Sequence, residues 1–182
     1  MARARKAASH PSLDELDPID EDSGDIVIVV ETPKGRRSKI AYDPERGVFM
    51  VKKVLPEGLV FPFDFGFIPS TKGGDGDPLD VLLLMDEPLT QGTVITARLV
   101  GVIEARQTER DGTVEKNDRL LAVATTSVLH QDVQTITDLP DSLIEQVERF
   151  FVSYNEQAGK RFDVLGRHGK QRAKNIFEAA RT

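Results

Sequence analysis

The chain has 182 residues, no cysteine and a formal net charge of −6 at neutral pH. This length suits one well-packed domain and leaves little room for a second. The acidic balance argues against a general affinity for nucleic acid or anionic membranes, and the lack of cysteine excludes disulfides, thiolate zinc sites and cysteine nucleophiles. No apolar run approaches membrane-spanning length, so we expect a soluble, cytoplasmic protein.

Residues 1–24 are predicted to form a flexible arm ahead of a single domain over residues 25–182. The arm opens with basic residues, continues with acidic ones, and has too few apolar residues to build a core. Its start lacks the apolar block of a secretory signal.

Short runs of β-branched and alternating apolar residues predict strands in most of the domain. Turn signals that contain glycine or proline separate these runs. The expected strands cover residues 26–30, 38–42, 48–54, 79–85, 93–104 and, as the last of them, 119–126. Residues 105–118 are polar, with Asp111-Gly112 at their centre, and are expected to form a hairpin-like loop.

The segment 61–69 combines four phenylalanines with Pro62, Gly66 and Pro69. Because proline cannot donate a ladder hydrogen bond, the segment is predicted to be too broken for a regular strand. We expect a buried corner beneath the turn at residues 73–80, with the phenylalanine rings in the core.

Apolar residues at helical spacing predict one helix that begins near residue 140 and ends at Gly159, and a second over residues 170–181. Strands followed by helices indicate an α+β fold that is mainly β. Several short strands with glycine-marked bends suit a small antiparallel OB-like β-barrel, with the two C-terminal helices packed against it.

The stretch 73–80 reads Gly-Gly-Asp-Gly-Asp-Pro-Leu-Asp and places three carboxylates within six residues, directly before an apolar run. Its glycines permit a tight turn, and Pro78 opposes a helix. Converging carboxylates repel one another unless a cation lies among them, so this acidic turn is a candidate hard-oxygen site for Mg²⁺ or Mn²⁺. Asp-Gly pairs are also common in solvated turns, and the turn alone leaves both interpretations open.

The segment 75–81, Asp-Gly-Asp-Pro-Leu-Asp-Val, resembles the signature of the soluble family I inorganic pyrophosphatases. The likeness extends from residue 25 to about the C-terminus, because further matching segments follow in the family's order. These are Val30-Glu31-Thr32-Pro33, Lys39, Phe61-Pro62, Phe65-Gly66-Phe67-Ile68, Gly101-Val102, Leu121-Ala122-Val123, Asp138-Leu139-Pro140 and Phe150-Phe151 with Tyr154. This ordered agreement is more specific than the acidic turn by itself.

The resemblance implies an OB-type barrel that hydrolyses pyrophosphate to two phosphates with Mg²⁺, through a metal-activated water. Carried over by position, the general base is Asp77. The other roles implied are metal binding by Asp75, Asp80 and Glu31, and phosphate binding by Lys39, Lys53, Arg119 and Tyr154. The resemblance also implies a homo-oligomer, commonly a hexamer in bacteria.

Several positions depart from the family pattern. A further metal-binding aspartate of the family aligns with Asn117, while Asp118 stands one place later. A shift of one residue turns a side chain to the other face of a strand, but a bulge at the strand end would let Asp118 serve; both residues are therefore candidate metal ligands. Another family aspartate corresponds loosely to Asp111. The remaining changes are Lys53 for arginine, Ala41 for glutamate, Phe65 for tyrosine, Asn155 for lysine and Arg119 for lysine.

Two functions therefore compete. The first is a working pyrophosphatase, in which Asp118 and Arg119 cover the changed positions, and the retained acidic residues favour it. The second is a pyrophosphatase-fold protein with weak or altered activity that binds a phosphorylated ligand or a protein partner. Lys160 and Arg161 follow the predicted first helix, and either could supply the cation that Asn155 lacks. Nucleic-acid binding has only fold analogy behind it.

Overall fold

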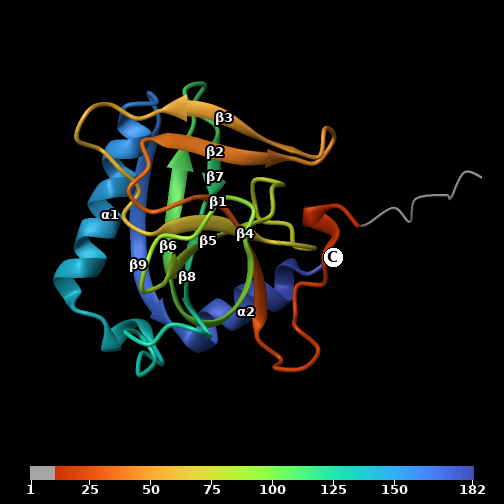
Figure 1. The fold of residues 1–182 in the computed structure, drawn as a ribbon. Coiled ribbons are helices and arrows are strands. Elements are labelled where there is room, and N and C mark those ends of the chain that lie inside the picture. The colour runs from red at the N-terminus through yellow and green to blue at the C-terminus, as the bar shows by residue number, and fades with distance from the viewer. Residues whose placement is uncertain (1–10) are drawn as a thin grey trace, which may run out of the picture.

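The computed structural model describes residues 11–182, and Figure 1 shows how their strands and helices are arranged. The strands are β1 (Ile26–Thr32), β2 (Ser38–Asp43), β3 (Val48–Val54), β4 (Asp64–Ile68), β5 (Leu79–Leu84), β6 (Val94–Thr108), β7 (Val114–Lys116), β8 (Arg119–Ala124) and β9 (Arg161–Gly169). The helices are α1 (Asp141–Glu156) and α2 (Lys170–Ala180), with short 3-10 turns at Leu13–Glu15 and Ile136–Asp138.

Five strands close into a ring. They pair in the order β1, β4, β5, β8 and β6, and β6 pairs back with β1. This ring confirms the OB-like, mainly β fold. One pairing, β5 with β8, is parallel, which differs from the antiparallel barrel that the sequence predicts. The cause is the position of β8, which inserts between β5 and β6 and is antiparallel only to β6.

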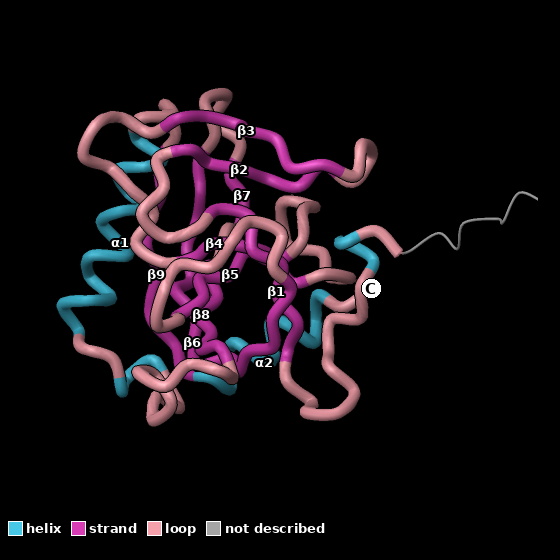
Figure 2. The backbone as a smooth tube through the Cα atoms, in the orientation of Figure 1, coloured by secondary structure: helices cyan, strands magenta, loops and turns pink. Residues whose placement is uncertain are grey.

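Strands β2 and β3 form a separate antiparallel ribbon. Figure 2 shows this ribbon as a layer beside the ring, joined to it through β1 and β4 along the chain. Its first strand lies close to β1, so the space between ribbon and ring can be lined from both sides.

Two hydrophobic cores lie on opposite faces of the ring strands, because successive side chains on a strand point to opposite faces. On β5, Leu82 belongs to an aromatic core with Phe151 of α1. Its neighbour Leu83 belongs to a mainly aliphatic core with Phe177 of α2. Both C-terminal helices therefore pack against the barrel as predicted, α1 along β9 and α2 along β6 (Figure 1).

The prediction that residues 61–69 are too broken for a strand is wrong. Residues 64–68 form β4, which is buried throughout and pairs with β1 and β5. Pro62 and Pro69 flank this strand and do not interrupt its ladder. Gly66 is required, because a Cβ atom there would lie 2.1 Å from the carbonyl oxygen of Val29.

The second half of β6 accounts for two further differences. The segment 105–118 does form a hairpin about Asp111-Gly112, but β6 continues to Thr108 and β7 forms the returning strand. The strand at 119–124 is not the last, because β9 pairs with β6 over most of its length. The charged residues and Gly166 of β9 conceal its strand character in the sequence.

Residues 11–24 run along the domain. The Ser70 amide donates to the Asp14 carbonyl at 2.8 Å, the Ser70 hydroxyl donates to the Leu16 carbonyl at 2.8 Å, and Ile19 forms a β-bridge with Ile26. Residues 1–10, which hold the basic part of the expected arm, lie outside the described residues. Among residues 11–182, no helix has the length and apolar character needed to cross a membrane.

Candidate active site

The acidic turn connects β4 to β5 and carries three carboxylates. Gly76 has a φ of +90°, a conformation that favours glycine. The Gly73 amide donates to the Asp77 carbonyl at 2.7 Å, and the Asp75 carboxylate accepts the Asp77 amide at 3.2 Å. These bonds fix the turn, and β5 then places Asp80 one residue inside the sheet.

A cavity of about 1190 Å³ opens above this turn, between the ribbon and the ring. It gathers side chains from the ribbon, the ring and α1, although they are far apart in the sequence. The predicted site residues that line it are Glu31, Lys39, Lys53, Asp75, Asp77, Asp80, Asn117, Arg119 and Tyr154. The structure therefore brings together all of the proposed residues except Asp118.

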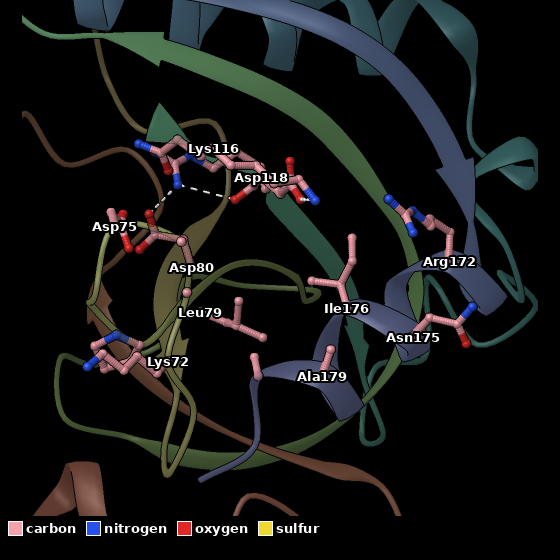
Figure 3. A pocket seen from close by; sticks show the side chains of 16 residues that line it. Lys72, Asp75, Leu79, Asp80, Lys116, Asp118, Arg172, Asn175, Ile176 and Ala179 are labelled. Carbon is pink, nitrogen blue, oxygen red and sulfur yellow. Dashed lines mark hydrogen bonds and ion pairs between the residues drawn. The ribbon is translucent and has the colours of Figure 1, made fainter. Parts of the chain in front are cut away.

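Asp118 lies outside that cavity and lines a smaller pocket of about 270 Å³. Its carboxylate accepts the Ala105 amide at 3.1 Å and pairs with the Lys116 ammonium at 2.8 Å. Figure 3 shows this smaller pocket, with Asp75 and Asp80 at one end and Arg172 and Asn175 of α2 at the other. Of the two candidate metal ligands at this position, Asn117 reaches the larger cavity.

The carboxylates of the turn influence one another. Burial raises the pKa of Asp75, and the charges of Asp80 and Asp77 raise it further. Hard carboxylate oxygens are ligands that suit a divalent cation, and such a cation would relieve their repulsion. Among the described residues no three such side chains already converge on one point, so the fit rests on donor chemistry and charge.

Arg119 lies between the acidic turn and the aromatic core. Its guanidinium pairs with the Asp80 carboxylate and lies 5.0 Å from the Phe151 ring centroid and 5.8 Å from that of Phe65. Within residues 11–182 its buried Nε–H has no hydrogen-bond partner. Since buried donors are rarely left unpaired, this unsatisfied Nε–H is an exception that distinguishes Arg119 among the residues that line the cavity.

Lys39 and Glu31 form a second charged pair in the cavity. Their Nζ and Oε2 atoms lie 3.4 Å apart, and the Lys39 ammonium lies 3.9 Å from the Phe65 ring centroid. The other Glu31 oxygen accepts the Tyr42 amide at 2.7 Å. Burial raises the pKa of Glu31 and lowers that of Lys39, so the cavity is a costly place for an unpaired charge.

Lys53 and Tyr154 meet on another side of the cavity. The Lys53 ammonium lies 3.4 Å from the Tyr154 ring centroid, a cation–π contact. Burial, and after it the charges of Lys160 and Lys39, lower the pKa of Lys53 to about 8. Burial raises the pKa of Tyr154 to about 12, so its hydroxyl stays protonated at neutral pH.

The cavity also contains polar residues that the sequence does not single out, namely Gln107 and Glu109. Asn117 Nδ2 donates to Gln107 Oε1 at 3.0 Å. Asp111, the loose sequence match to a family aspartate, instead lies exposed at the tip of the β6–β7 hairpin, where its carboxylate accepts the Thr113 amide at 2.9 Å. Gln107 reaches the cavity because β6 continues to Thr108. The polar composition of this segment does not indicate a strand, so the sequence gives no local sign of this role.

Asn155 is a structural residue of α1. Its side chain is 2% exposed and donates to the Phe151 carbonyl at 2.8 Å. Arg161 pairs with Asp163 at 3.0 Å and is not among the residues that line the cavity. Lys160 and Arg161 are the two candidates to replace the family lysine at the Asn155 position, and only Lys160 lines the cavity.

Comparison with known proteins agrees with this geometry. The family model described as inorganic pyrophosphatase matches residues 28–182. The inorganic pyrophosphatase of Haloferax volcanii is 35% identical over 157 residues, which are 86% of each chain. The crystal structure of the Thermus thermophilus inorganic pyrophosphatase superposes with a TM-score of 0.84 at 29% identity, covering 93% of this chain and 97% of that one. A structure from Neisseria gonorrhoeae gives a TM-score of 0.81 at 31% identity, covering 91% and 94%.

Membership in this family implies a dependence on divalent metal in general. The ordered sequence match, the ring of strands and the cavity that gathers the acidic turn with cationic side chains lead to one assignment. The chain belongs to the inorganic pyrophosphatase family.

Proposed function

We propose that this chain hydrolyses inorganic pyrophosphate to two phosphates, with Mg²⁺ as its cofactor. The observation that carries the proposal is a single cavity in which the carboxylates of Asp75, Asp77 and Asp80 share space with the cations Lys39 and Arg119. Pyrophosphate is a compact polyanion, so its hydrolysis needs positive charge around the phosphates and an acceptor for the proton of the attacking water.

Asp77 is the proposed general base. Its backbone is held at both ends, by the Gly73 amide on its carbonyl and by its own amide on the Asp75 carboxylate. Its side chain lines the cavity and is exposed, so it can orient a water and take its proton.

Asp75 and Asp80 are the proposed metal ligands, with Glu31 and Asn117 at the edge of the same set. Mg²⁺, when bound there, supplies positive charge that neutralises phosphate and lowers the pKa of water. Mn²⁺ accepts the same oxygen ligands. Arg119 pairs with Asp80, and this pairing holds that carboxylate in the cavity.

Lys39, Lys53, Arg119 and Tyr154 are the proposed phosphate ligands. Arg119 lines the cavity beside Asp80, and its guanidinium carries several N–H donors suited to phosphate oxygens. Tyr154 donates through a hydroxyl that remains protonated, since its pKa is about 12. The matches to inorganic pyrophosphatases favour hydrolysis over a fold relative that only binds a phosphorylated ligand or a partner.

We also propose a homo-oligomer, of which a hexamer is one form, located in the cytoplasm. Exposed apolar side chains on the β2–β3 ribbon support self-association, because Val51 and Val54 are each 60% exposed. Light scattering coupled to size exclusion measures the subunit number, and cell fractionation measures the location.

The test is phosphate release from pyrophosphate by the purified chain, with and without Mg²⁺, beside an Asp77→Asn variant. We expect Mg²⁺-dependent release that Asp77→Asn lowers by about 100-fold or more, the usual contribution of a general base. Asp111→Asn is the matched control, since Asp111 lies exposed at a turn away from the cavity. A folded wild-type chain that releases no phosphate with Mg²⁺ or Mn²⁺ would contradict the proposal.

A further inference from the structure

A second wall of the cavity consists of side chains joined in one hydrogen-bonded chain. We call Gln107, Glu109, Asn117 and Lys160 the hairpin wall, because three of them lie on or beside the β6–β7 hairpin. Asn117 donates to Gln107 at 3.0 Å, Gln107 donates to the Glu109 carboxylate, and the Lys160 ammonium lies 2.8 Å from that carboxylate. All four residues line the large cavity.

The hairpin wall has little negative charge to offer a cation. Gln107 and Asn117 are neutral amides, and the Gln107 oxygen already accepts a hydrogen bond from Asn117. Of the two hairpin carboxylates that line the cavity, Glu109 is paired with Lys160, and Glu115 lies opposite Gln107 on β7. Divalent cations are held most strongly where ligand charge accumulates, so, apart from the Asn117 oxygen at the edge of the proposed metal site, this wall suits an anionic ligand better than a metal ion.

The backbone before Lys160 is fixed in place. After α1 ends, the Asn155 carbonyl accepts the amides of Ala158 at 2.9 Å and of Lys160 at 3.0 Å. Gly159 adopts a φ of +71°, and Arg110 of the hairpin turn donates to the Ala158 carbonyl at 2.7 Å. The α1 end and the hairpin are thereby joined, and this connection directs Lys160 towards Glu109 in the cavity.

Lys160 also acts on the phosphate-binding side of the cavity. Its charge is, after burial, the largest cause of the lowered pKa of Lys53. Lys39 contributes to the same shift, so the ammonium groups of Lys160 and Lys39 both repel that of Lys53 across this space. A polyanion bound among them removes that repulsion.

We propose that Lys160 binds a phosphate group of the substrate and supplies positive charge at the wall formed by the amides of Gln107 and Asn117. Glu109 holds its ammonium in the cavity before substrate arrives. The inference rests on the proposed function, since that function defines the anion. It assigns to this chain a cation that lies beyond the end of α1 and replaces the one missing at Asn155.

The experiment measures binding of methylenediphosphonate, a non-hydrolysable pyrophosphate analogue, to the full chain in Mg²⁺ by titration calorimetry. Lys160→Met keeps most of the side chain and removes its charge, and we expect it to weaken binding about tenfold, as for the loss of one charge-assisted hydrogen bond. Lys160→Arg should restore most of the affinity, because it keeps the charge. Arg161→Met is the matched control and should bind as the wild type does, because Arg161 does not line the cavity.

Lys160→Met that binds the analogue within twofold of Arg161→Met would overturn the inference. Thermal unfolding of each variant confirms that the compared proteins are folded. Failure of the proposed function is distinguishable, because phosphate release from pyrophosphate by the wild type is measured separately. A chain that binds the analogue through Lys160 but releases no phosphate would keep the inference and reject the hydrolysis.

Discussion

The acidic turn and the hairpin wall enclose the same cavity and handle charge in opposite ways. On the turn, Asp75, Asp77 and Asp80 lie close enough that the charges of the other two help to raise the pKa of Asp75. On the hairpin wall, amides bond to each other and the single carboxylate is paired with a lysine. The turn concentrates negative charge, whereas within the hairpin wall the charges of Glu109 and Lys160 are paired, and Glu115 beside it adds one further carboxylate. We therefore expect changes on the turn to affect metal binding and chemistry, and changes on the wall to affect substrate affinity.

The largest effect is expected for Asp80→Asn on the acidic turn. The change removes a proposed metal ligand, and we expect phosphate release to fall by about 100-fold or more. It also leaves the buried Arg119 charge without its partner, so the free energy of unfolding should fall by about 3 kcal/mol. Steady-state phosphate release and urea unfolding measure the two effects. If the Asp80→Asn variant released phosphate at the wild-type rate, Asp80 of the acidic turn would not be a ligand of the catalytic metal.

The reverse change on the hairpin wall is Asn117→Asp, which adds a carboxylate where an amide now lies. Because divalent affinity rises with ligand charge, we expect Mn²⁺ to bind about tenfold more tightly. Electron paramagnetic resonance of free Mn²⁺ measures this in the absence of substrate. Gln131→Glu adds the same charge on an exposed loop away from the cavity and controls for net charge. Equal Mn²⁺ affinity in both variants would contradict the contrast between the walls.

A smaller effect is expected from pH through Lys53. Its pKa is lowered to about 8, so the ammonium is charged below pH 8 and becomes neutral as the pH rises through that value. Affinity for methylenediphosphonate should therefore fall between pH 7 and pH 9, by up to about tenfold from this group. In Lys53→Arg the guanidinium stays charged throughout, and the fall should be smaller. The ionisation of the analogue is common to both proteins, so parallel profiles would exclude Lys53 as the cause.

Much of the fold is predictable because its signals are local. The β-branched run of β1 and the glycine-rich turn before β5 can each be predicted from a few neighbouring residues. Strand β4 was harder to predict because Pro62 and Pro69 suggest a broken segment, while only the tertiary pairing shows that both lie outside the ladder. Strand β9 lacks a clear alternation, and its long pairing with β6 decides its conformation.

In the candidate site, too, some residues can be predicted from the sequence and others depend on tertiary structure. The residues of the acidic turn, Lys39 and Tyr154 were predictable from the family resemblance, and the structure places them in one cavity. Whether Asn117 or Asp118 faces that cavity depends on the phase of the strand that follows, which composition does not fix. Gln107 and Lys160 reach the site only because β6 is long and the end of α1 is tied to the hairpin. These are properties of the assembled fold.

The most direct test of the account is to compare kcat and KM for pyrophosphate in Asp77→Asn and Lys160→Met under one set of Mg²⁺ conditions. A base acts only on the chemical step, so Asp77→Asn should lower kcat by about 100-fold or more with little change in KM. A residue that binds substrate and transition state alike affects KM, so Lys160→Met should raise KM about tenfold with kcat nearly unchanged. The two walls would then have separate roles. If both variants lower kcat with KM unchanged, or if neither differs from the wild type, the division between the two walls is wrong.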